Sequence, residues 1–294
     1  MIQLPSFKVS RNTLQELKRR TFLIQIKGNF AACSQYAKTA WESRTSSKAG
    51  KEAFKEITDK LLRLSRNHGI CHYCEQNTST DIEHVFPKRW FPLKTFDPKN
   101  YLSACGDCNT HNKKDLFAIF IPEGSKTKVV VSEKPENEDA CIVNPRIENP
   151  MDYFWLDIRT GQFIIHPNIA TFSTSRVYQK AEYTCNTLLR LNGRNDTLIN
   201  ARKHAIKDYS NLLKQYIRVK ISENFEELDE AIDPLDIPDK SVDFNSEKEA
   251  YLGAIKNTII THSHPTVWFE LIRQRKNYSK LQALFQQAPE ALTW

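Results

Sequence analysis

Two cysteine pairs, Cys71-His-Tyr-Cys74 and Cys105-Gly-Asp-Cys108, bracket the stretch Asp81-Ile-Glu-His-Val-Phe-Pro-Lys88. Each Cys-x-x-Cys pair offers two thiolates from one tight loop, and zinc prefers four such soft ligands in a tetrahedron. The spacing therefore predicts one structural zinc site formed by all four cysteines. Because the gap between the pairs is longer than in a compact zinc ribbon, a further structural segment must fold between them.

The composition is that of an ordinary globular protein. The chain has 294 residues and a mass of 34.1 kDa, with 40% hydrophobic and 26% charged residues. Its aliphatic runs are too short to cross a bilayer, and its first residues lack the apolar core of a signal peptide. We therefore expect a cytoplasmic protein with reduced thiols. Cys33, Cys141 and Cys185 lie outside the two pairs and are expected to be ordinary buried residues.

The formal net charge of +7 is unevenly distributed along the chain. Residues 1–128 contain 22 Lys and Arg against 12 Asp and Glu, whereas residues 221–250 contain 11 acidic residues and two basic ones. A basic first half suits contact with a polyanion such as nucleic acid. The acidic stretch is typical of a solvated linker.

Hydrophobic spacing and turn residues predict an α+β, mostly helical protein. Leu14, Leu17 and Phe22 are expected on one face of a first helix, and a second helix is expected from Gly50 to Asn67. We expect five regions in chain order: an N-terminal helical region (1–69), a core of a β-hairpin followed by a helix (70–120), a strand-then-helix region packing on that core (121–220), an acidic linker (221–246) and a C-terminal helical region (247–294).

The core region carries further motif residues in a fixed order. Glu83-His84 follows the first cysteine pair, Asn100-Tyr-Leu precedes the second, and Asn109 directly follows Cys108. This order, over about residues 70–116, resembles the HNH, or ββα-metal, family of endonucleases. Zinc-containing members of the family share the Cys-x-x-Cys-Asn ending. The resemblance implies a ββα-metal core with a four-cysteine zinc site.

The resemblance also implies a role for each motif residue. The histidine of the acid–histidine pair is the family's general base, which corresponds to His84, and the central asparagine that orients it corresponds to Asn100. The metal-binding acid and the asparagine after the last cysteine correspond to Glu83 and Asn109, with His111 as the alternative to Asn109. The family commonly has aspartate where this chain has glutamate. Adjacent residues face opposite sides of a regular strand, so Glu83 and His84 can share one site only if the strand ends or bulges there.

These residue types suit hydrolysis of a phosphodiester bond. A neutral histidine can accept a proton from water, and a hard divalent ion held by carboxylate and amide oxygens, Mg²⁺ or Mn²⁺, can polarise the phosphate. Basic residues beside the core are expected to contact nucleic acid, with DNA as the expected substrate: Lys88, Arg89, Lys113 and Lys114.

A longer pattern, Cys-His-Tyr-Cys-Glu followed by Ile-Glu-His and Pro-Lys, resembles the nuclease subunit of Septu-type anti-phage defence systems. In those systems an ABC/SMC-like ATPase controls the nuclease, so the resemblance implies an ATPase partner and a docking role for the C-terminal half. The alternative is a non-catalytic zinc module that binds nucleic acid or a protein. Glu83, His84 and Asn109 would then be surface or packing residues.

Overall fold

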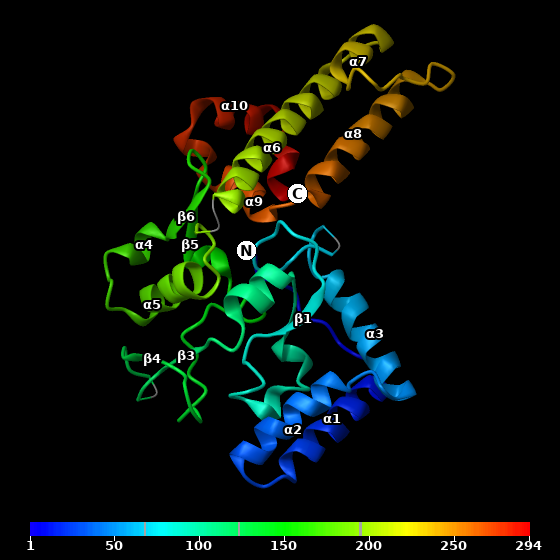
Figure 1. Cartoon of the computed structure of the whole chain (residues 1–294). Coiled ribbons are helices and arrows are strands. Elements are labelled where there is room, and N and C mark those ends of the chain that lie inside the picture. The colour runs from blue at the N-terminus through cyan, green and yellow to red at the C-terminus, as the bar shows by residue number, and fades with distance from the viewer. Residues whose placement is uncertain (68, 123, 194–195) are drawn as a thin grey trace. The chain divides into compact units, whose positions relative to one another are not determined.

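The computed structural model describes residues 1–67, 69–122, 124–193 and 196–294. Within these ranges the fold is α+β and mainly helical, with three two-stranded sheets (Figure 1). The chain forms two compact units, the first from Met1–Trp155 with Phe163–Leu198 and the second from Leu156–Gln162 with Ile199–Trp294. In the part of the chain that the structure describes, no helix combines the length and apolar character needed to cross a membrane.

Three helices open the first unit: α1 (Arg11–Gln25), α2 (Phe30–Glu42) and α3 (Lys48–Leu62). Each begins after a residue whose side-chain oxygen accepts a hydrogen bond from the backbone N–H three positions on, and these caps are Ser10, Asn29 and Ser47. The second predicted helix therefore starts earlier, because Ser47 caps it, and it ends at Leu62 rather than Asn67.

The predicted apolar face of α1 is wrong at two positions. Leu17 is buried, but Leu14 and Phe22 are exposed. The buried side of α1 instead includes Leu17 and Ile24, which lie seven residues apart and so two turns along the same face. These side chains join a cluster with Trp41, Phe54, Phe96 and Tyr101 that forms the core beneath the hairpin.

A short β-hairpin and a helical segment follow. Strand β1 (Asp81–His84) pairs antiparallel with β2 (Tyr101–Ala104), so that Glu83 lies opposite Leu102 and His84 opposite Tyr101. The segment η3 (Asp107–Lys113) is a π-helix. The predicted order of a hairpin followed by a helix is confirmed, and β1 ends at His84, where a shared site requires the strand to end or bulge.

The rest of the first unit consists of short elements: η1 (Pro92–Lys94), η2 (Pro98–Asn100), β3 (Ala118–Phe120), β4 (Lys128–Val130), η4 (Pro150–Asp152), β5 (Phe154–Asp157), β6 (Gln162–Ile165), α4 (Pro167–Ala170), α5 (Arg176–Glu182) and η5 (Tyr183–Leu188). Strands β3 and β4 pair antiparallel, and β5 and β6 form a third two-stranded sheet. The turn between β5 and β6 contains Gly161 with a φ of 72°, which glycine adopts without strain.

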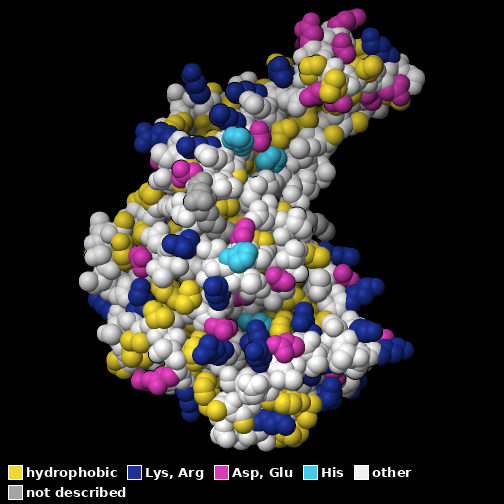
Figure 2. Space-filling model, viewed as in Figure 1, with side chains coloured by type: hydrophobic (Ala, Val, Ile, Leu, Met, Phe, Trp, Pro, Cys, Tyr) yellow, Lys and Arg dark blue, Asp and Glu magenta, His cyan; other side chains and the backbone are white. Residues whose placement is uncertain are grey.

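The second unit is helical: α6 (Thr197–Ile221), α7 (Phe225–Ala231), α8 (Phe244–Thr261), α9 (Pro265–Gln274), η6 (Arg275–Asn277), α10 (Ser279–Gln287) and η7 (Pro289–Thr293). Helix α6 thus belongs, from Ile199 onward, to this unit, whereas the sequence analysis grouped residues 121–220 in one region. The stretch expected as an acidic linker contains α7, which Asn224 caps and which buries Leu228. Acidic side chains gather at the α7–α8 end of the unit (Figure 2).

Candidate functional site

The two cysteine pairs come together as the sequence predicted. The sulfur atoms of Cys71, Cys74, Cys105 and Cys108 lie within 4.8 Å of one another, and all four residues are buried. Zinc bonded tetrahedrally to sulfur at ~2.3 Å would place the sulfurs about 3.8 Å apart. The Sγ atoms of Cys74 and Cys105 are 3.8 Å apart, so the cluster has the donor type and spacing that structural zinc requires.

His72 anchors the first cysteine loop to the hairpin. Its backbone N–H donates to the Ser103 carbonyl (2.8 Å), and its ring Nδ1 accepts from the Ser103 N–H (3.1 Å). Burial lowers the pKa of His72 to about 4, so the ring is neutral and acts as an acceptor. The loop before β1 is therefore fixed directly to β2.

A cavity of about 300 Å³ lies beside the hairpin and gathers most of the predicted catalytic residues. Glu83, His84 and Asn109 all line this cavity. His111 does not, because its exposed ring turns to Asp107, with 3.0 Å between Nδ1 and Oδ1. Of the two alternative metal ligands, only Asn109 shares the cavity with Glu83.

The His84 ring is held in one orientation. Its Nε2 lies 3.0 Å from the carbonyl oxygen of Thr95, which also accepts a hydrogen bond from the Tyr101 hydroxyl (2.7 Å). The Trp41 ring packs edge-on at 4.3 Å between centroids. A carbonyl oxygen can only accept, so Nε2 carries the proton. Burial, aided by Lys88, lowers the pKa of His84 to about 3, which keeps the free ring neutral.

The second ring nitrogen of His84, Nδ1, forms no hydrogen bond with the protein within the described ranges. A neutral imidazole protonated at Nε2 has its lone pair at Nδ1, so this nitrogen is the one able to accept a proton. His84 lines the cavity and is only 4% exposed, which leaves the cavity as the route of access to the ring.

Asn100 fixes the loop that carries the Thr95 carbonyl. Its Oδ1 accepts from the Phe86 N–H (2.7 Å), and its Nδ2 donates to the carbonyls of Phe86 and Lys94, each at 3.0 Å. These bonds join the segment just after β1 to the loop at Lys94, next to the Thr95 carbonyl that contacts the His84 ring. Among the described residues, Asn100 forms no hydrogen bond with the His84 ring itself.

Lys113 was expected to contact nucleic acid, and this expectation is wrong. The side chain is fully buried, with Nζ 2.5 Å from Glu83 Oε1 and 2.7 Å from the His84 carbonyl oxygen, to which it donates. An ammonium in the interior needs such partners. Burial raises the pKa of Glu83, and the Lys113 charge opposes that rise. Lys113 thus links η3 to the end of β1.

The other basic residues predicted to bind nucleic acid occupy different positions. Lys88 and Lys114 line the cavity. Arg89 instead lies over the Trp90 ring at 4.5 Å and lines a neighbouring hollow with His111. On the face shown in Figure 2, basic and acidic side chains are interspersed over the first unit.

The sequence analysis did not single out several residues that line the cavity, among them Asp81, Trp41 and Arg44. Asp81 lies two residues before Glu83 on β1, a spacing that places both on one face of a strand and could have signalled it. Trp41 and Arg44 come from the end of α2 and the turn after it, and their sequence positions carry no motif. The carboxylates of Asp81 and Glu83 and the amide of Asn109 supply hard oxygen donors of the kind that Mg²⁺ or Mn²⁺ binds.

Comparison with known proteins gave no match to a family model, to a curated protein or to a solved structure.

Replacing Cys71 with serine should remove the metal and unfold the first unit. Structural zinc contributes ~10–16 kcal/mol in small zinc domains, which rivals the total stability of about 5–15 kcal/mol of an ordinary domain. Elemental analysis should find one zinc in the parent and none in Cys71→Ser, and the thermal unfolding midpoint should fall sharply. Cys33→Ser, a buried cysteine outside the cluster, should keep the zinc. Equal zinc content in both variants would contradict the assignment.

Replacing Lys113 with methionine should destabilise the protein by roughly 3–5 kcal/mol, because it leaves the buried Glu83 carboxylate without its partner. Urea unfolding measures the loss. Lys114→Met removes an exposed charge next in sequence and should cost far less. Adding Glu83→Gln to Lys113→Met should recover part of the loss, and the pairing is refuted if the two lysine variants are equally stable.

Proposed function

We propose that the chain is a metal-dependent HNH endonuclease that hydrolyses phosphodiester bonds, with DNA as substrate. One observation carries this proposal: Glu83, His84 and Asn109 line a single cavity, and the His84 ring is held there by Thr95 with Nδ1 uncommitted. About 300 Å³ is room for a phosphate group and its waters, since each water occupies ~30 Å³.

In the proposed reaction, Nδ1 of His84 accepts a proton from the attacking water as its oxygen bonds to phosphorus. The bond from phosphorus to the leaving oxygen breaks, and that oxygen takes a proton from solvent. A free-ring pKa of about 3 is low for a general base, but a phosphate anion in the cavity stabilises the imidazolium and raises it. Lys88 and Lys114 supply positive potential along the cavity wall.

Glu83, Asn109 and Asp81 are the residues proposed to hold the catalytic Mg²⁺ or Mn²⁺. When bound, the ion would polarise the phosphate and stabilise the charge of the leaving oxygen. Glu83 also contacts Lys113, so its carboxylate would be shared between the ammonium and the metal. Lys113 thereby fixes the position of a metal-binding oxygen.

The proposal extends to an anti-phage defence role with an ABC/SMC-like ATPase partner. Its support is the sequence pattern Cys71-His-Tyr-Cys-Glu75, followed by Ile82-Glu-His84 and Pro87-Lys88, which resembles Septu-type nuclease subunits. The second unit is the proposed docking region, because the cysteine cluster and the cavity belong to the first.

The competing function is a non-catalytic zinc module that binds nucleic acid or protein. The Glu83–Lys113 contact favours it, since a carboxylate satisfied by a buried ammonium can be purely structural. Only an activity measurement separates the two functions.

His84→Ala should abolish cleavage of plasmid DNA in the presence of Mg²⁺ or Mn²⁺. Loss of a general base costs ~10²–10⁴-fold in rate. Gel electrophoresis of supercoiled plasmid measures nicking and cutting, and His204→Ala, an exposed histidine on α6, is the matched control. Unchanged zinc content and melting would show that His84→Ala is folded. Equal cleavage by parent and His84→Ala would rule out the proposed base.

A further inference from the structure

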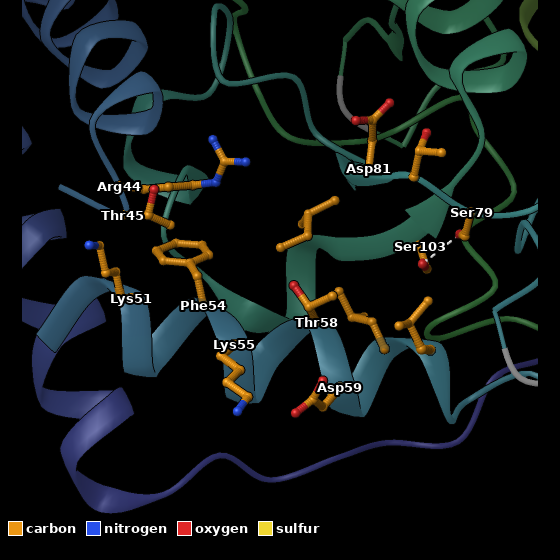
Figure 3. Close-up of a pocket in the computed structure, with 14 residues that line it drawn as sticks. Arg44, Thr45, Lys51, Phe54, Lys55, Thr58, Asp59, Ser79, Asp81 and Ser103 are labelled. Carbon is orange, nitrogen blue, oxygen red and sulfur yellow. Dashed lines mark hydrogen bonds between the residues drawn. The ribbon is translucent and has the colours of Figure 1, made fainter. Parts of the chain in front are cut away.

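Arg44 lies just beyond the end of α2 and lines two adjoining hollows. One is the cavity that contains His84, and the other is a pocket of about 400 Å³ lined by residues of α3 and of the hairpin (Figure 3). In Figure 3 the Arg44 side chain extends over Phe54 toward the space beside the hairpin, whereas Lys55 and Asp59 project from the other side of α3. Arg44 is thus the cation at the junction of the two hollows.

Aromatic rings and carbonyl groups hold the Arg44 guanidinium in place. Its Cζ lies 4.5 Å from the centroid of the Trp41 ring and 5.7 Å from that of Phe54. Its Nη1 donates to the Trp41 carbonyl (3.1 Å), and its own carbonyl accepts from Arg20 Nη2 (2.9 Å). The same Trp41 ring packs against His84, so one side chain positions both the guanidinium and the imidazole.

Across the described residues, Arg44 forms no ion pair with Asp or Glu, whereas the nearby Arg20 pairs with Glu16 at 2.7 Å. The Asp81 carboxylate lines both hollows with Arg44 and favours its charged form, but it lies beyond ion-pair distance. Burial lowers the pKa of Arg44, which shows that the guanidinium is partly withdrawn from water. Charges withdrawn from water are ordinarily paired, and the planar fork of a guanidinium matches two oxygens of a phosphate.

We propose that Arg44 binds non-bridging oxygens of the phosphate that is cleaved in the His84 cavity. The inference rests on the proposed nuclease function and adds to it a substrate-binding residue from outside the cysteine module. As water adds to phosphorus, negative charge grows on these oxygens, and a guanidinium already fixed by Trp41 and Phe54 stabilises it without reorganisation.

The test compares Arg44→Gln and Arg44→Lys with Lys55→Gln. Lys55 is an exposed cation that lines the same outer pocket but projects away from the hairpin, so it controls for loss of charge alone. With plasmid DNA and Mg²⁺, we expect Arg44→Gln to lower the cleavage rate about 100-fold or more, and Lys55→Gln to lower it only slightly. Arg44→Lys keeps the positive charge but loses the planar guanidinium, so its cleavage rate should lie between those of Arg44→Gln and Lys55→Gln. Its thermal unfolding midpoint should equal that of the parent.

A second readout does not depend on turnover. Binding of a short fluorescent DNA duplex is measured against salt concentration in the His84→Ala background, with and without Arg44→Gln. The DNA-binding constant K falls as the salt concentration rises. The plot of log K against log salt concentration becomes less steep by ~0.9 for each phosphate contact that is lost. Arg44→Gln should show this reduction, and Lys55→Gln should not.

The outcomes separate the two proposals. If the parent cleaves DNA but Arg44→Gln matches Lys55→Gln in both rate and salt slope, the Arg44 inference is wrong and the nuclease function stands. If the parent never cleaves but Arg44→Gln still reduces the slope, the nuclease proposal fails while phosphate binding by Arg44 holds. An unchanged slope without any cleavage overturns both.

Discussion

The four-cysteine cluster is the constraint on which the rest of the candidate site depends, because it joins the two ends of the hairpin. Cys71 and Cys74 precede β1, and Cys105 and Cys108 follow β2. Each strand has only four residues, and an isolated two-stranded hairpin is marginally stable in water. Joining the loop before one strand to the loop after the other fixes which residues face each other across the hairpin, including His84 opposite Tyr101.

The hairpin in turn places three polar side chains where they are almost fully buried. Glu83 and His84 lie at the last two positions of β1, and Lys113 extends from η3 to the Glu83 carboxylate and to the His84 carbonyl. The His84 ring is held by the Thr95 carbonyl, which lies in the loop between the strands. These contacts join the hairpin, the loop and η3, so all three must be in place for the arrangement to form.

Much of the core region (residues 70–120) could be predicted from sequence because the spacing of its cysteines and motif residues depends on local structure. The Cys-x-x-Cys turns and the hairpin follow from motifs, and the structure brings the four sulfurs together. The burial of Lys113 could not be predicted from sequence. A lysine next to another lysine is expected on the solvent-exposed surface, and the sequence does not show that Glu83 is its partner in the interior. Trp41 and Arg44 were missed because their proximity to His84 arises from helix packing between distant segments.

The π-helical geometry of η3 constrains the length of this part of the chain. The Lys114 N–H donates to the Asn109 carbonyl at 2.7 Å, five residues earlier, so the segment is wound more widely than an α-helix. Asn109 lines the cavity and Lys113 reaches Glu83 from this single turn. Removing one residue between them would rotate the later side chains of the segment about its axis and turn the ammonium away from the carboxylate. The contact between Lys113 and Glu83 therefore depends on the number of residues in η3.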